Sequence, residues 1–127
     1  MREQRKANRE HYCDCCGRRI YPGMEYIAEN DIAHGRHVTR KLHIHCDALL
    51  EIVGRETPLS TGKRYVQLRH WLEDNVCSRC RADESCDQND VYNCAYVLLE
   101  VLPASYGAAA TKSMLALEKH ENGDWHE

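Results

Sequence analysis

The sequence predicts a small α+β domain that is held together by bound metal. Eight cysteines occur among 127 residues, and most of them fall into two groups with the spacing of metal ligands. Short strand-like segments separated by Pro-Gly and His-Gly turns occupy residues 19–44. Helical patterns of apolar residues follow at 47–53, 63–75, 90–102 and 105–119. We therefore expect a β-rich metal finger followed by a helical metal-binding lobe.

Bound metal is expected to supply much of the stability. Charged residues make up 29% of the chain and phenylalanine is absent, so the apolar core should be thin for this length. Disulfide bonds are the rival explanation for eight cysteines. The first residues are polar, without the apolar run of a signal peptide, and no stretch has the roughly 20 apolar residues of a membrane span. We expect a reducing, cytoplasmic setting without membrane contact, in which Cys-x-x-Cys motifs hold metal.

The first candidate metal site combines a Cys-x-x-Cys motif, Cys13 and Cys16, with a His-x-x-Cys motif, His43 and Cys46. Each motif holds two side chains at the separation that one tetrahedral zinc ion requires. Gly17 directly after the second cysteine allows the backbone to turn and to direct its amides at the sulfur atoms. The four side chains are therefore expected to complete one metal shell.

The segments around this site are expected to form short hairpins and a helix. Strands at 19–21 and 25–28 would flank a turn at Pro22 and Gly23, and strands at 27–32 and 37–44 would turn through His34-Gly35-Arg36. The helix at 47–53 would end at Gly54, a residue suited to the position after a helix.

This order of knuckle, hairpins and helix resembles the treble-clef zinc finger, and the ligand spacing resembles the first half of a LIM domain. The resemblance covers residues 11–54 and implies a structural zinc bound by Cys13, Cys16, His43 and Cys46. It departs from LIM after Cys46, where Asp-Ala-Leu-Leu stands in place of another Cys-x-x-Cys. The finger is therefore expected, and a LIM function is not.

Two positions near the first site have alternatives. Cys15 lies between the knuckle cysteines, and we interpret it as a thiol that points outward, with replacement of a neighbouring ligand as the alternative. His45 competes with His43 for the metal. His43 is favoured because His-x-x-Cys spacing lets both side chains reach one ion, whereas the adjacent pair His45 and Cys46 is awkward.

The second candidate site has four cysteines within 18 residues: Cys77, Cys80, Cys86 and Cys94. Cys94 is expected in the first turn of a helix, where the positive end of the helix dipole favours thiolates. Four thiolates suit zinc and iron–sulfur clusters alike. Zinc is favoured because the spacing matches neither common ferredoxin pattern. The sequence thus predicts two Zn²⁺ ions, with an iron–sulfur cluster as the alternative at this site.

The chain is expected to divide into a finger at 11–54 and a helical lobe at 60–120. Residues 1–10 are interpreted as a flexible basic arm or an opening helix, and residues 121–127 as a flexible tail. The helix at 105–119 has a small amphipathic face that either docks on the core or joins copies in an oligomer. The oligomeric state therefore stays open.

Catalytic motifs are incomplete in this chain. His120-Glu121 lacks the second histidine of His-Glu-x-x-His, and the segment at 60–63 lacks the leading glycine of a phosphate-binding loop. Both metal shells are expected to be closed, with four protein ligands and no open position for water or substrate. We therefore do not expect an enzyme.

Charge favours a protein partner over a nucleic acid. The net charge is −3, and residues 48–127 carry 8 Lys/Arg against 13 Asp/Glu, whereas residues 1–47 carry 9 against 7. An acidic chain is a poor general binder of polyanions. We expect a small zinc protein that acts as a protein-interaction or regulatory module. The alternative is a nucleic-acid-binding finger that uses a local basic cluster: Arg18, Arg19, Arg36, Arg40 and Lys41.

Overall fold

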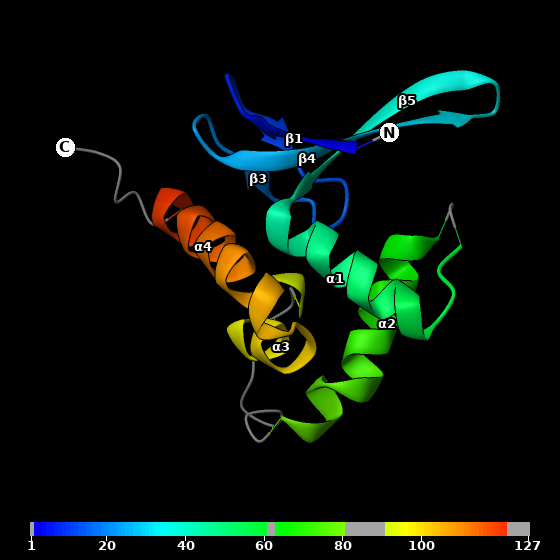
Figure 1. Cartoon of the computed structure of the whole chain (residues 1–127), viewed down its shortest axis with the longest axis vertical. Coiled ribbons are helices and arrows are strands. Elements are labelled where there is room, and N and C mark those ends of the chain that lie inside the picture. Colours follow the sequence, from blue (N-terminus) through cyan, green and yellow to red (C-terminus); the bar gives the residue numbers. More distant parts are fainter. Residues whose placement is uncertain (1, 61–62, 81–90, 122–127) are drawn as a thin grey trace.

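The computed structural model describes residues 2–60, 63–80 and 91–121 (Figure 1). It is a mixed structure in which a small antiparallel sheet lies beside a group of helices. Its strands are β1 (Arg2–Lys6), β2 (His11–Tyr12), β3 (Arg19–Ile20), β4 (Glu25–Ala33) and β5 (Arg36–His43). Its helices are α1 (Ile44–Glu56), α2 (Arg64–Asn75), α3 (Ala95–Val101) and α4 (Ala104–Glu121), with short 3-10 turns η1 (Cys77–Arg79) and η3 (Val91–Asn93).

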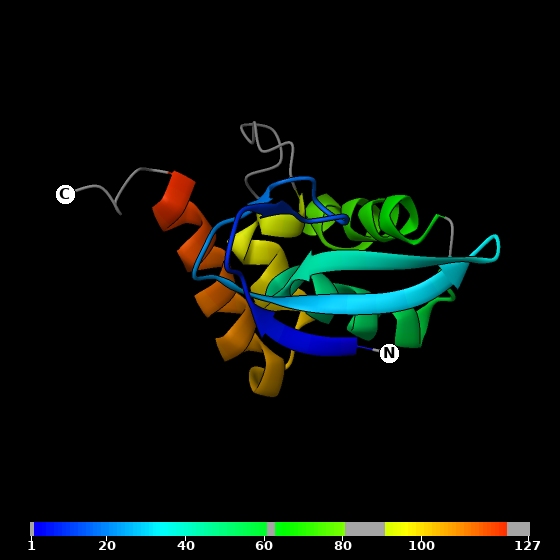
Figure 2. The same ribbon diagram turned by 90° about the horizontal axis from the view of Figure 1, so that it is seen from above.

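Strand β4 is the centre of a three-stranded sheet with the order β1-β4-β5. It pairs with β5 from Tyr26 opposite His43 to Ala33 opposite Arg36. The two residues between these strands, His34 and Gly35, have φ angles of 53° and 77°. Positive φ at both positions gives a tight turn that matches the twist of the flanking strands. The hairpin is therefore continuous up to its tip, which lies at one end of the molecule in both views (Figures 1 and 2).

The prediction of a flexible arm or opening helix at residues 1–10 is wrong for its first part. Arg2–Lys6 form β1, which pairs with β4 from Arg2 opposite Glu29 to Lys6 opposite Glu25. All five residues of β1 are exposed. Such a strand has no apolar alternation of its own, because it is an edge strand ordered by the backbone of its neighbour.

The short strand β3 pairs with β2, with Tyr12 opposite Arg19, and not with β4 across the Pro22–Gly23 turn. The helix after the finger is longer than expected. It begins directly after His43, continues through Gly54 and ends at Glu56. The expectation that Gly54 ends the helix is therefore wrong. A side chain at Gly54 would contact Leu59, which packs against the core.

A single hydrophobic cluster joins the two predicted segments, 11–54 and 60–120. Helix α1 packs against α2, α3 and α4, and Figure 1 shows it between the sheet and the other helices. The leucines and valines without exposed surface come from β5 and from helices α1, α2 and α3: Leu42, Leu49, Val53, Leu68, Leu72 and Val97. Leu98 of α3 and Leu117 of α4 are nearly as buried. The core thus holds the end of β5 and the start of α1 between the sheet and the other helices.

Candidate metal centre

The knuckle that carries Cys13 and Cys16 is a tight turn between β2 and β3. The amide of Cys13 donates to the carbonyl of Arg18 over 2.8 Å, and the amide of Gly17 donates to the carbonyl of Cys13 over 2.9 Å. Gly17 has a φ of 77°, a left-handed conformation that residues with a side chain adopt at a cost. This glycine therefore allows the chain to turn back directly after Cys16, so that its amide reaches the carbonyl of Cys13.

The other two side chains come from the junction of sheet and helix. His43 is the last residue of β5 and Cys46 lies in the first turn of α1. The ligand atoms of Cys13, Cys16, His43 and Cys46 all lie within 4.8 Å of one another. In the part of the chain that the structure describes, no other cluster of three or more such residues is found. Three cysteines and one histidine at this separation form a possible metal site.

The site is enclosed by the protein. Cys13 is 2% exposed, and His43 and Cys46 have no exposed surface, whereas Cys16 is half-buried. Burial in apolar surroundings is costly for ionised groups that have no opposite charge beside them. A bound cation would supply that charge.

The thiols at this site are unequal in acidity. Burial tends to raise the pKa of Cys13, but the Cys16 and Cys46 thiols and the amides of Cys16 and His43 donate hydrogen bonds to it and hold its pKa well below the ordinary value. The amide of His43 lies 3.4 Å from the Cys13 sulfur. Burial raises the pKa of Cys46 well above its ordinary value, and the neighbouring cysteines, Cys13 first, raise it further. The pKa of Cys13 is therefore shifted in the opposite direction from that of Cys46, and a metal ion would bind both as thiolates.

His43 is oriented as a ligand by a second hydrogen bond. Its Nδ1 lies 3.3 Å from the sulfur of Cys16, and its Nε2 lies 2.8 Å from the carbonyl oxygen of Arg19. A carbonyl only accepts hydrogen bonds, so Nε2 carries the proton and Nδ1 presents a lone pair to the site. Metal-binding histidines are commonly fixed in this way by a partner on the far nitrogen.

The competing residue, His45, points into the helical part of the core instead. Its Nδ1 lies 2.9 Å from the hydroxyl of Ser113 and its Nε2 lies 2.5 Å from Oδ1 of Asn93. Burial and the nearby His43 lower the pKa of His45 to about 4, so its ring is neutral near pH 7. The ring stacks on that of His43 at a centroid distance of 4.9 Å. His45 thus couples the metal site to η3 and α4.

The interpretation of Cys15 as an outward-pointing thiol is wrong. Cys15 is only 8% exposed, and its side chain hydrogen-bonds with that of Cys46. It stands outside the group of four whose ligand atoms lie within 4.8 Å of one another. Cys15 does not point to solvent, because it belongs to the hydrophobic core against which the knuckle packs.

The second predicted site cannot be assembled from the described residues, because Cys86 lies outside them. Cys77 begins η1, Cys80 follows that turn, and Cys94 directly precedes α3; all three are half-buried. Cys94 is thus the N-cap of α3 and not a residue of its first turn. The four-cysteine site stays a prediction.

The residues of the predicted basic cluster are largely engaged with carboxylates. Arg18 lies 2.6 Å from Glu121, Arg19 lies 3.6 Å from Glu10, and Arg40 lies 3.2 Å from Asp31. Arg36 is exposed near the tip of the hairpin and Lys41 is half-buried. The five side chains are therefore spread over the knuckle and the length of β5.

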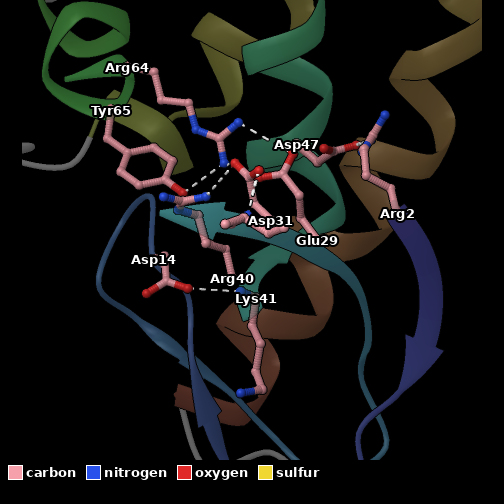
Figure 3. A network of polar contacts seen from close by, with 10 residues as sticks. Arg2, Asp14, Glu29, Asp31, Arg40, Lys41, Asp47, Arg64 and Tyr65 are labelled. Carbon is pink, nitrogen blue, oxygen red and sulfur yellow. Dashed lines mark hydrogen bonds and ion pairs between the residues drawn. The ribbon is translucent and has the colours of Figure 1, made fainter. Parts of the chain in front are cut away.

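A band of polar contacts ties the sheet to α1 and α2 (Figure 3). Arg64 of α2 makes an ion pair with Glu29 of β4, and Arg2 of β1 pairs with Asp47 of α1. The knuckle contacts the hairpin where the amide of Lys41 donates to the Asp14 carboxylate over 2.8 Å (Figure 3). These contacts hold β4 and β5 over the start of α1, where two of the four candidate ligands lie.

Three supports of the site carry no signal in the sequence: Asn93, Ser113 and the carbonyl of Arg19. Asn93 and Ser113 are 48 and 68 residues away from His45 in the sequence. No local pattern connects them, since neither spacing nor periodicity marks a hydrogen bond between distant elements. Only the packing of α1 against η3 and α4 brings them to the site.

Comparison with known proteins finds no match. Neither a protein-family model, nor a curated protein, nor a solved structure matches this chain. Within the described residues, no helix has the length and apolar character required to cross a membrane.

Proposed function

We propose that this chain is a small zinc protein in which Cys13, Cys16, His43 and Cys46 bind one structural Zn²⁺ in a treble-clef-like finger. The observation that carries the proposal is the convergence of four ligand atoms within 4.8 Å of one another from the knuckle and the β5–α1 junction. Three thiolates and one imidazole are a ligand set that structural zinc uses. Four protein ligands fill a tetrahedral shell, so the ion has a structural role and not a catalytic one.

The zinc would join the knuckle to the junction of β5 and α1, which it otherwise meets through the contacts between Asp14 and Lys41. The knuckle, the hairpin and α1 meet at the site, and the knuckle is only a few residues long. A short turn of this kind lacks the apolar area to fold independently. Metal binding therefore contributes directly to the free energy of folding.

We further propose that the folded chain acts as a protein-interaction or regulatory module. The ion pairs of Arg18, Arg19 and Arg40 favour this over nucleic-acid binding, because a phosphate backbone would have to displace a carboxylate from each arginine. The acidic half of the chain, residues 48–127, acts in the same direction.

Elemental analysis with a visible spectrum tests the metal part of the proposal. Two zinc ions per chain and a colourless protein are expected, one at the finger and one at the four-cysteine site. Absorption at roughly 400 nm would assign an iron–sulfur cluster to the second site. A protein that folds with no bound metal would refute the proposal.

A salt titration separates the two classes of partner. Affinity for random DNA or RNA should be weak at physiological salt, with a Kd of roughly 10⁻⁴ M or higher. Replacing Arg36, Arg40 and Lys41 together with alanine should then change little. If affinity is instead high and falls steeply with salt, and the triple replacement flattens that slope, the chain is a nucleic-acid reader.

A further inference from the structure

Among the described residues, no backbone group pairs with the outer edge of β1. The amide of Ala7 donates to the carbonyl of Met24 over 2.9 Å, and this pair continues the β1–β4 register beyond Lys6 opposite Glu25. In an antiparallel ladder, successive residues direct their backbone groups alternately toward and away from the partner strand. The amides and carbonyls of Gln4 and Lys6 therefore point away from β4. In the described part of the sheet β1 is one of the two edge strands, and β5 is the other.

A groove lies on the same side of β1 that carries the Gln4 and Lys6 side chains. It has a volume of about 740 Å³, within the range of binding pockets. Its lining residues come from β1 and the start of β4 on one side and from α4 on the other. The groove lining includes the apolar side chains Met24, Ile44 and Ala116.

The groove has more positive than negative charge. Lys6 of β1 and Lys112 of α4 both line it and are exposed. The single carboxylate of the lining, Glu25, accepts a hydrogen bond from the Gln4 side chain over 3.1 Å. An anionic side chain entering the groove would therefore meet two ammonium groups.

We propose that β1 and this groove form a docking site for an extended acidic segment of a partner protein. The segment adds to the sheet as a fourth strand, and its backbone pairs with Gln4 and Lys6. Alternate side chains of the segment enter the groove, where carboxylates meet Lys6 and Lys112 and apolar groups contact Met24 and Ile44. Strand addition of this kind combines main-chain hydrogen bonds for affinity with side-chain pockets for specificity. The inference rests on the proposed interaction function and names the chemistry of its partner.

A second copy of the chain fits this edge less well. Antiparallel pairing of two β1 strands about Gln4 would place Arg2 opposite Lys6 of the other copy on the face of the groove, while Glu3 would meet Arg5 only on the opposite face. Like charges directly opposite each other destabilise a strand pair, and charged residues commonly protect natural edge strands from self-association. An acidic strand replaces this repulsion with attraction.

A synthetic ten-residue peptide of alternating valine and glutamate is the probe for the metal-loaded protein. We expect it to bind and to slow hydrogen exchange at the amides of Gln4 and Lys6, which face outward. The amides of Glu3 and Arg5, which face β4, should be protected already. A peptide with lysine in place of glutamate, and one with its four central amides N-methylated, should bind at least about tenfold more weakly.

Two variants with matched controls locate the site. Gln4→Pro removes an outward amide that β4 does not use, and an edge strand tolerates proline at such a position. The variant should keep the fold and bind the peptide at least about tenfold more weakly. Lys112→Glu should also weaken peptide binding at least about tenfold, because it places a carboxylate in the groove where the glutamates of the peptide would enter. Lys63→Glu on the loop before α2 makes an equal change of net charge outside the groove and should have no effect.

Several outcomes would overturn the docking site. These are the absence of peptide binding, equal binding of the lysine peptide, binding without protection of Gln4 and Lys6, displacement of the peptide by a single-stranded oligonucleotide, and dimerisation through β1. Each of these leaves the zinc-dependent fold and an interaction surface elsewhere intact. Failure of the proposed function would appear separately, as a chain that folds with no bound metal or as nucleic-acid affinity that falls steeply with salt.

Discussion

Replacing His45 with phenylalanine tests whether this residue supports the metal site from behind or binds the metal itself. The ring of His45 has no exposed surface, and it hydrogen-bonds with Ser113 over 2.9 Å and with Asn93 over 2.5 Å. Phenylalanine retains the ring volume and the stack on His43. It removes both hydrogen bonds and leaves a buried hydroxyl and a buried amide oxygen without the imidazole.

The expected cost follows from these two contacts. A buried polar group that loses its partner costs about 1–3 kcal/mol. His45→Phe affects two such groups and should lower the free energy of unfolding by about 2–6 kcal/mol. Adding Ser113→Ala should recover part of this loss, because the orphaned hydroxyl is removed with its partner. Urea denaturation of the zinc-loaded variants, with the metal content determined in parallel, measures both effects.

The metal content decides between the two histidines. His45→Phe should keep the zinc of the finger, whereas His43→Phe should lose it, because His43 directs Nδ1 at Cys16 and the site. Loss of one zinc equivalent in His45→Phe, with retention in His43→Phe, would show that the ligand assignment is reversed. A change in stability below about 0.5 kcal/mol would refute the role of His45 in the core.

Three further results are expected. Removing the metal with a strong chelator should expose the amides of the knuckle and of the first turn of α1 to rapid exchange, because thiolates without a cation cannot stay buried there; unchanged protection would contradict this. Cys15→Ser should keep the full metal content but lower the free energy of unfolding by about 1–3 kcal/mol, since a hydroxyl replaces a thiol in a buried position. Loss of metal from this variant would show that Cys15 is a ligand. Arg64→Met should lower the free energy of unfolding by about 1–3 kcal/mol, because Arg64 and Glu29 are only 19% and 17% exposed. Arg69→Met, at the exposed pair with Glu73, is the control and should cost less than about 0.5 kcal/mol in the same urea titration. Equal costs for the two variants would contradict the role of burial.

The candidate ligands could be predicted from the sequence because each pair of ligands lies within a short segment of the chain. Cys13 and Cys16 are held by one turn, and His43 and Cys46 by one strand–helix junction. The sequence predicts each half of the site independently, and the structure brings the halves together. The turn at His34-Gly35 can likewise be predicted from the sequence, because a glycine between two strand-like segments favours positive φ.

The remaining features depend on contacts between distant segments. Arg2–Lys6 become a strand because β4 offers them backbone partners, and their polar sequence gives no sign of it. Gly54 remains inside α1 because packing of α1 against the core outweighs the low helix propensity of one glycine. The burial of Cys15 and the hydrogen bonds of His45 depend on how the finger meets the helices, which no short pattern encodes.

The most direct test of the structural-zinc account is the zinc content of Cys46→Ser beside that of the wild-type chain. Cys46 has no exposed surface and lies within 4.8 Å of the other three ligand atoms. The variant should lose one zinc equivalent and unfold at a lower urea concentration, with Cys15→Ser as the control that keeps the metal. A Cys46→Ser protein that retains every zinc ion of the wild type would contradict the structural-zinc account.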